Sequence, residues 1–147
     1  MQVGRSTLEA LDRVIVAAVG ITTVALAQAD RAGDLTFPQW RVLVVVGERP
    51  SGVRVSEVAR RIGASSPSAS RLIRRMERAG LVTTARDETD RRATLVGLSD
   101  AGARVRSTVI SHRRRLVARL FRSHKGRLPR DLDHGLKAIG EVLSSDS

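Results

Sequence analysis

The sequence predicts a mainly α-helical chain with a small β-hairpin wing, arranged as a winged helix-turn-helix. A short helical segment ends at Gly63, and a second, basic segment follows after a tight turn and closes on Gly80. Two β-like runs, residues 81–85 and 93–98, come next, and the charged loop 86–92 joins them. Two short helices followed by a hairpin in this spacing are typical of the winged form of the motif.

The segments before this motif predict two further helices. Residues 6–30 carry apolar side chains at three- and four-residue steps, as one face of a helix does. Thr36 and Gln39 form a capping-box pattern with Pro38 in the first turn, and the helix that they start is expected to stop near Gly47.

The second helix of the motif is expected over residues 66–79, with Pro67 in its first turn, where the missing N–H of proline costs nothing. After the hairpin, Ser99 is expected to cap a long helix. A final helix is predicted over residues 131–143.

These elements divide the chain into three predicted parts: an N-terminal helix (1–34), the winged helix-turn-helix (35–100), and a long linker helix with a C-terminal helix (101–147). Residues 101–130 include ten basic and no acidic residues. This basic block, Arg104 to Arg130, has three interpretations that the pattern leaves open: a solvated face beside an apolar seam, contacts with DNA flanks, or the lining of a pocket for an anionic ligand.

The composition favours a polyanionic partner and disfavours several other functions. The net charge is +11, and aromatic residues make up only 2% of the chain, which leaves few platforms for stacking single-stranded bases. The absence of cysteine excludes disulfides and thiol redox switches. Since the histidines have no metal-ligand spacing and no nucleophile–base pair is evident, we expect no catalytic residue, no metal, no cofactor and no enzymatic activity.

The start of the second motif helix has the pattern of a helix that reads a major groove. Short hydroxyl side chains come first, so that the backbone can approach DNA closely, and long arginine donors follow. The alternative is an ordinary amphipathic helix with a solvated arginine face. The candidate DNA-binding residues are Ser66, Ser68, Ser70, Arg71, Arg74 and Arg75.

The hairpin loop supplies a second candidate contact. Arg86, Arg91 and Arg92 alternate there with acidic residues, and the negative potential of a minor groove attracts guanidinium groups. We expect Asp90 to orient the Arg92 guanidinium through a charge-assisted hydrogen bond. The alternative is a soluble turn whose charges neutralise one another.

The ordered set of motifs resembles the MarR family of bacterial transcription regulators over residues 35–102. The residues that carry the resemblance are Leu35, Thr36, Gln39, Val42, Leu43, Ser56, Glu57, Val58, Ala59, Ser70, Arg71, Leu72, Ile73, Met76, Glu77, Gly80, Leu81, Val82, Asp90, Arg91, Arg92, Leu98, Ser99 and Gly102. The resemblance implies an obligate homodimer, in which residues 1–34 form an N-terminal dimerisation helix and residues 101–147 a long linker helix with a C-terminal dimerisation helix. It further implies that residues 35–100 are a DNA-binding domain on a palindromic operator, with Ser66 to Arg75 in the major groove and Arg92 in the minor groove. It also implies release from DNA by a small, often aromatic and anionic, ligand.

This sequence departs from the family pattern in two places. Thr84 stands where relatives usually carry a basic residue, so Arg86 is a candidate to replace that backbone contact. Oxidation-sensing relatives use a cysteine, and this chain has none.

Together these observations predict a cytoplasmic, homodimeric, sequence-specific regulator of double-stranded DNA, a repressor with a possible small-molecule effector and no membrane partner. Three alternatives remain at this point: a sequence-indifferent nucleoid-type binder, a regulator that has lost DNA binding and acts as an adaptor, and an exported basic protein. The last rests on the uncharged run 14–29, which offers a cleavage pattern near Ala27.

Overall fold

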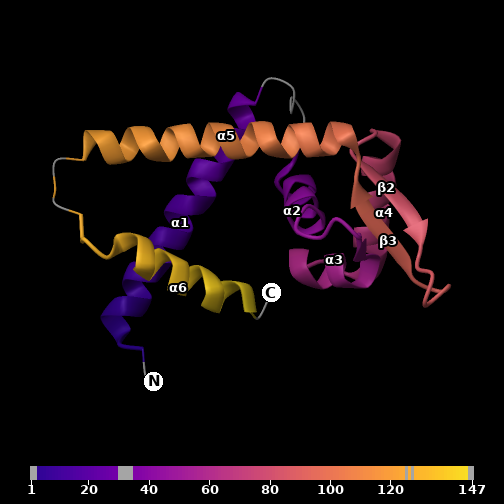
Figure 1. Cartoon of the computed structure of the whole chain (residues 1–147), viewed down its shortest axis with the longest axis horizontal. Helices are drawn as coiled ribbons and strands as arrows, with labels where there is room; N and C mark the ends of the chain where they lie inside the picture. Colours follow the sequence, from indigo (N-terminus) through magenta and orange to yellow (C-terminus); the bar gives the residue numbers. More distant parts are fainter. Residues whose placement is uncertain (1–2, 30–34, 125, 127, 146–147) are drawn as a thin grey trace.

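The computed structural model describes residues 3–29, 35–124, 126 and 128–145. One long helix, α5, runs along one side of the molecule and connects the part that holds the sheet to the part that holds α1 and α6 (Figure 1). In chain order the elements are α1 (Arg5–Gln28), α2 (Phe37–Val46), β1 (Val53–Arg54), α3 (Val55–Ile62), α4 (Ser66–Arg78), β2 (Val82–Arg86), β3 (Thr94–Leu98), α5 (Asp100–Ser123) and α6 (Leu132–Ser145).

Local capping signals start the helices where the sequence predicts. The Thr36 hydroxyl accepts from the backbone N–H of Gln39 at 3.4 Å, and the Gln39 side chain accepts from the backbone N–H of Thr36 at 2.8 Å. The Ser65 hydroxyl caps α4 by accepting from the Ser68 backbone N–H, and the Ser99 hydroxyl caps α5 by accepting from the Gly102 backbone N–H. Gly63 ends α3 at a φ of 69°, a left-handed conformation that glycine adopts without steric cost. The predicted break between the first two helices lies in residues 31–34, outside the described residues.

The sheet contains one strand that the sequence analysis missed. Its order is β1-β3-β2, all antiparallel, and the predicted hairpin pairs Val82 with Leu98 and Arg86 with Thr94. The two-residue strand β1 adds to the other edge of β3 by pairing Val53 with Val96. Two residues are too few for an alternating pattern, so only the tertiary pairing defines this strand.

The main core lies within the helix-turn-helix and sheet. Helix α2 is its centre, because Val42, Leu43, Val45 and Val46 are all buried in this core together with residues of α3, α4 and the sheet. A second, smaller cluster of Ala25, Ala29, Trp40 and Val109 joins α1, α2 and α5. The start of α5 fits tightly against the turn after α4, where a Cβ on Gly102 would overlap the carbonyl oxygen of Leu81.

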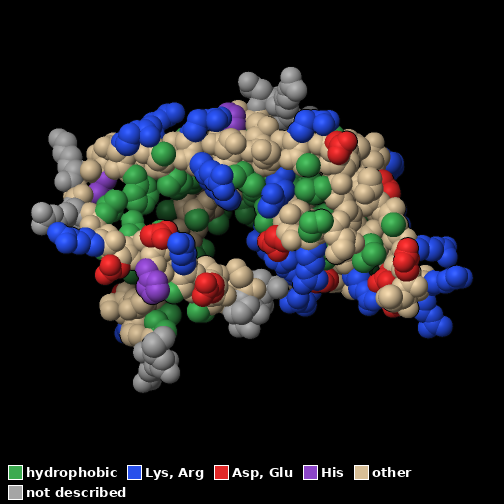
Figure 2. All heavy atoms as spheres, in the orientation of Figure 1, with side chains coloured by type: hydrophobic (Ala, Val, Ile, Leu, Met, Phe, Trp, Pro, Cys, Tyr) green, Lys and Arg blue, Asp and Glu red, His purple; other side chains and the backbone are tan. Residues whose placement is uncertain are grey.

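The opposite end of the molecule exposes apolar side chains. Val14, Val16 and Val19 of α1 are exposed, as are Leu136 and Ile139 of α6. Figure 2 shows hydrophobic side chains gathered around the hollow between α1, α5 and α6. By length and composition α1 could cross a membrane, with a mean hydropathy of 1.8; signal sequences and core helices of soluble proteins meet the same criterion.

Candidate nucleic-acid interface

Helix α4 presents its hydroxyl and arginine side chains on the face opposite its buried stripe. Ala69, Ile73 and Met76 are buried in the core. Of the six predicted α4 residues, Ser70 is half-buried and the rest are exposed: Ser66, Ser68, Arg71, Arg74 and Arg75. The structure therefore places the predicted group together on one surface.

The first turn of α4 is held by its own side chains. The Ser65 hydroxyl accepts from the Ser68 backbone N–H at 3.3 Å and donates to the Ser68 hydroxyl at 2.9 Å. The Arg71 guanidinium donates to the same Ser68 hydroxyl at 3.2 Å. Arg71 is thus held back against the start of the helix, while Arg74 and Arg75 lie one turn further along.

The wing is connected to α4 through its first strand. The hydroxyl of Thr84 on β2 donates to the carboxylate of Glu77 on α4 at 2.5 Å. Thr84 therefore links the wing to the helix. Arg86, at the end of β2, is exposed.

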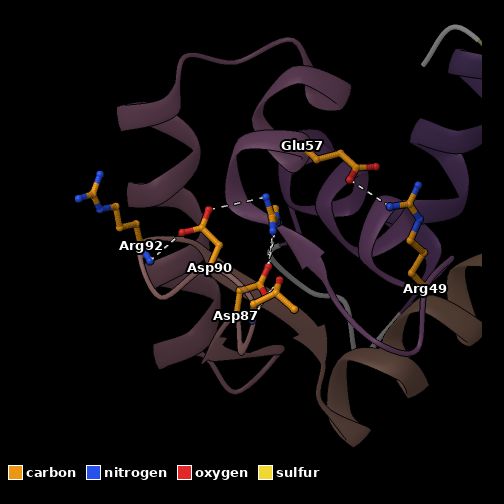
Figure 3. A network of polar contacts seen from close by, with 7 residues as sticks. Arg49, Glu57, Asp87, Asp90 and Arg92 are labelled. Atoms are coloured by element: carbon orange, nitrogen blue, oxygen red, sulfur yellow. Dashed lines mark hydrogen bonds and ion pairs between the residues drawn. The ribbon is translucent and has the colours of Figure 1, made fainter.

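Within the wing loop, Asp90 and Arg92 are hydrogen-bonded, but the prediction that the bond involves the Arg92 guanidinium is wrong. Asp90 accepts from the backbone N–H of Arg92 at 3.1 Å, and the Arg92 side chain extends away from it (Figure 3). The reason is local: over two residues, an aspartate closes an Asx-turn with backbone more readily than it reaches a long side chain. Arg91 and Arg92 are both exposed.

The partner of the wing carboxylates is Arg54, which the sequence analysis did not single out. Its Nε and Nη2 lie 2.9 Å and 2.7 Å from the same oxygen of Asp87. Its Nη1 lies 3.8 Å from a carboxylate oxygen of Asp90. Arg54 lies 33 residues before Asp87 in the chain, so no local pattern connects the two.

Asp87 is almost completely buried and fully hydrogen-bonded. Its other oxygen accepts from the hydroxyl and the backbone N–H of Thr89, at 2.7 Å and 2.9 Å. These bonds from Thr89, with a further contribution from Arg54, lower the pKa of Asp87 from 3.8 to about 2. The side chain is therefore ionised at any physiological pH.

A groove of about 390 Å³ joins the α4 surface to the wing. Its walls include Ser66 and Ser70 of α4, Asp90 and Arg92 of the wing, and Arg54 between them. Predicted residues from both elements thus line one continuous surface.

The arginines of α4 and the wing lack internal counter-ions. In the described part of the chain, carboxylates pair with Arg5, Arg49, Arg54, Arg61 and Lys137. None of the predicted α4 or wing arginines takes part in these ion pairs, and Figure 2 shows basic side chains over this end of the molecule. Unpaired guanidinium groups on one face are suited to phosphate and base-edge contacts.

A second cavity, of about 500 Å³, lies between α1 and α5 and is mainly apolar. Ala18, Ile21 and Phe121 line it, together with Arg113 and Arg114. The Arg113 guanidinium is half-buried and lies 5.9 Å from the centre of the Trp40 ring. Burial lowers the pKa of Arg113, and the neighbouring charges of Arg114 and Arg106 lower it further.

A helix-turn-helix with exposed donors on its second helix, followed by a hairpin bearing arginines, defines a winged-helix protein of the DNA-binding class. Residues 33–93 match the profile of the MarR family. This segment is therefore similar to the MarR family, and the curated relatives that the chain matches include transcriptional regulators.

Individual relatives agree with this assignment. The HTH-type transcriptional regulator TtmR of Methylorubrum extorquens is 34% identical over 105 residues, which are 69% of this chain and 53% of TtmR. The crystal structure of RV1404 from Mycobacterium tuberculosis superimposes with a TM-score of 0.80 at 26% identity, covering 97% of each chain. CouR of Rhodococcus jostii, solved bound to p-coumaroyl-CoA, has a TM-score of 0.67 at 26% identity, covering 92% of this chain and 87% of CouR. The chain matches about half the length of its curated relatives.

Proposed function

We propose that this chain is a homodimeric, sequence-specific regulator that binds double-stranded DNA, with α4 in the major groove and Arg92 of the wing in the adjacent minor groove. The observation that carries the proposal is the single surface on which the unpaired arginines of α4 and the wing lie together, on either side of one groove. A major groove admits a helix, and an adjacent minor groove attracts guanidinium groups.

In this arrangement the residues have distinct roles. Arg74 and Arg75 read base edges, since they are exposed beyond the first turn of α4. Ser66, Ser68, Ser70 and Arg71 contact the sugar–phosphate backbone, because hydroxyl groups and a held-back arginine suit short contacts that position the protein. Arg86 and Arg91 hold the phosphates beside the wing, and Asp90 supports the loop from which Arg92 extends.

The proposed dimer forms through the N- and C-terminal helices. Three helices expose large apolar side chains here, and such side chains are expected to be covered by a partner surface: Val16 and Val19 of α1, Leu120 of α5, and Leu136 and Ile139 of α6. A second copy of the chain covers it and places two α4 helices about one turn of DNA apart, as a palindromic operator requires. Residues 1–34 and 101–147 thus serve assembly, and residues 35–100 serve DNA binding.

We further propose that an amphipathic organic anion binds in the cavity between α1 and α5 and releases a repressor from its operator. The cavity offers apolar walls and the guanidinium groups of Arg113 and Arg114, a combination that suits a small aromatic acid or its thioester. CouR, which is 26% identical, is solved with p-coumaroyl-CoA. Such a regulator works in the cytoplasm, where its DNA lies.

Sequence-specific binding is tested by selecting bound fragments from the source genome and competing them with random duplex at fixed salt. We expect an enriched palindromic site and at least 10³-fold preference over random DNA, the range of specific binders. Arg74→Ala should reduce this preference more than it reduces binding to random DNA.

The matched control is Arg119→Ala, which removes the same charge from an exposed position on α5. It should lower affinity for both kinds of DNA equally and slightly. If Arg74→Ala behaves like Arg119→Ala, or if random duplex competes as well as any fragment, the net charge of +11 accounts for binding and the protein is a sequence-indifferent binder.

A further inference from the structure

The wing of this chain is held by one arginine from outside the hairpin. Arg54 ends β1 and precedes the first residue of α3, so its backbone is paired with Leu95 on one side and continues into the helix-turn-helix on the other. Its side chain extends to the two carboxylates of the wing loop, Asp87 and Asp90. Figure 3 shows both carboxylates directed toward one guanidinium.

The contact has the geometry of a structural anchor rather than of a surface ion pair. Two nitrogens of Arg54 lie within 2.9 Å of one oxygen of Asp87, and the Asp87 side chain is only 10% exposed. The other oxygen of Asp87 accepts two hydrogen bonds from Thr89, so both carboxylate oxygens are held and the side chain is fixed in one orientation. The Arg54 side chain is itself 45% exposed, but two directed hydrogen bonds onto a nearly buried carboxylate make this pair stronger than one in which both partners are exposed.

Backbone hydrogen bonds connect the rest of the wing loop to the two anchored aspartates. The Asp87 backbone N–H donates to the Ala93 carbonyl at 3.0 Å, and the Ala93 N–H donates to the Asp90 carbonyl at 2.8 Å. Asp90 in turn accepts from the backbone of Arg92. Holding Asp87 and Asp90 therefore holds the backbone from which the Arg92 side chain extends, without any contact to the Arg92 guanidinium.

We propose that Arg54 is a positioning residue for DNA recognition, which sets the wing at a fixed distance from α4 so that both elements meet their grooves together. This proposal rests on the proposed function, because it assigns to Arg54 a role in the same DNA interface. Arg54 itself lines the groove between Ser66 of α4 and Arg92 of the wing, so it connects the two contact surfaces directly.

The mechanical part of the proposal is tested without DNA. The chain contains no cysteine, so two introduced cysteines can be spin-labelled selectively. We choose Glu88→Cys in the wing and Ala79→Cys at the end of α4, because both positions are exposed. Dilution into unlabelled protein leaves only the distance within one chain to be measured. We expect a narrow distance distribution that broadens at least twofold with Arg54→Ala and with Asp87→Asn. With Arg54→Lys the width of the distribution should lie between those of the unmodified chain and of Arg54→Ala, because lysine keeps the charge but cannot form the same hydrogen bonds to both carboxylates.

The matched control is Arg49→Ala. Arg49 also pairs with a carboxylate, Glu57, at 3.1 Å, in the same lobe but away from the wing (Figure 3). It should leave the distribution unchanged. An unchanged distribution in Arg54→Ala, in a protein whose circular dichroism is native, overturns the proposal.

The functional part is tested on the selected operator by a double-mutant cycle. Arg54→Ala should weaken operator binding about tenfold, the order of one lost directed contact. In that background Arg92→Ala should cost less than it does alone, whereas Arg74→Ala should keep its full effect, because only the wing is released. Full additivity of Arg54→Ala with Arg92→Ala would refute the positioning role.

The two proposals fail in different ways. If the unmodified chain does not prefer any operator, the proposed function fails, while the distance measurement still decides whether Arg54 holds the wing. If operator binding is specific but Arg54→Ala binds as tightly as the unmodified chain, only the positioning role is lost.

Discussion

The lobe of residues 35–99 and the helices that flank it place their apolar side chains in opposite ways. In the lobe, Leu43, Met76 and Val96 are fully buried, and the arginines lie outside. In α1 and α6 many apolar residues are exposed, and Val16 is 65% exposed, although Ala25 at the far end of α1 is buried. The comparison indicates that the lobe has a core of its own, whereas the flanking helices leave apolar side chains that the proposed dimer would cover.

The arginines differ between the two regions as well. Arg74 and Arg92 are exposed on the surface that we assign to DNA, while Arg113 is half-buried over Trp40 beside an apolar cavity. A half-buried guanidinium beside an aromatic ring and an apolar cavity is suited to an anion that also carries an apolar group. The same residue type therefore has two proposed uses in the molecule, separated by burial.

The largest expected effect is a loss of folding stability when a buried side chain of the lobe is removed. Met76→Ala removes a fully buried side chain from α4 and should lower the free energy of unfolding by about 2–5 kcal/mol. Urea denaturation followed by circular dichroism measures it. Val16→Ala, at an exposed position of α1, removes no buried contact within one chain, so its effect should be much smaller and limited to the part of the free energy that depends on protein concentration through the proposed dimer. Equal losses from both substitutions would contradict the difference between the two regions.

The next effect concerns the flanking helices. Ile139→Asp places a charge on the exposed apolar face of α6 and should convert a dimer into monomers, because an interface does not accept an unpaired charge. Operator affinity should fall roughly hundredfold as the two half-sites are no longer bound together. Sedimentation and a binding titration measure the two outcomes.

His134→Asp is the control for that substitution. His134 is exposed, and at helical spacing it lies on the opposite side of α6 from Ile139, so the same new charge should leave the dimer intact. A dimer that survives Ile139→Asp would place the interface elsewhere.

A smaller effect is expected on the DNA-binding side. Arg92→Ala should weaken operator binding by ~1–3 kcal/mol without changing the free energy of unfolding, since the side chain is exposed and makes no internal ion pair in the described part of the chain. A titration at fixed salt measures it. Unchanged affinity would remove the wing from the interface.

The smallest effect is a pH dependence in the wing. The pKa of Asp87 is lowered from 3.8 to about 2 in the folded chain, so its ionised form adds stability that is complete above its ordinary pKa and is lost as the pH falls toward 2. The protection factor of the Thr89 amide proton, the exchange rate of an unprotected amide at the same pH divided by its own, should therefore fall in that window. Asp87→Asn should flatten this dependence, and an equally steep profile in that variant would assign it to another group.

Local signals made most of the fold predictable, and a long-range contact accounts for what was missed. The caps at Thr36, Ser65 and Ser99 act within three residues, so the helix starts could be identified from the sequence. Strand β1 and the Arg54–Asp87 pair depend on segments 33 or more residues apart, which no periodic pattern reports. The sequence correctly predicted that Asp90 and Arg92 interact, but not which atoms do so.

The 24-residue helix α5 is a rigid rod about 36 Å long, with one end in each region. Its first turn packs so tightly against the backbone of Leu81 that position 102 has no room for a side chain, which fixes this end of α5 to the lobe. If α5 tilts as a rigid body by about 5°, its two ends move relative to each other by about 3 Å across the helix axis. An anion that wedges α1 away from α5 would thereby alter the separation of two paired α4 helices without touching either.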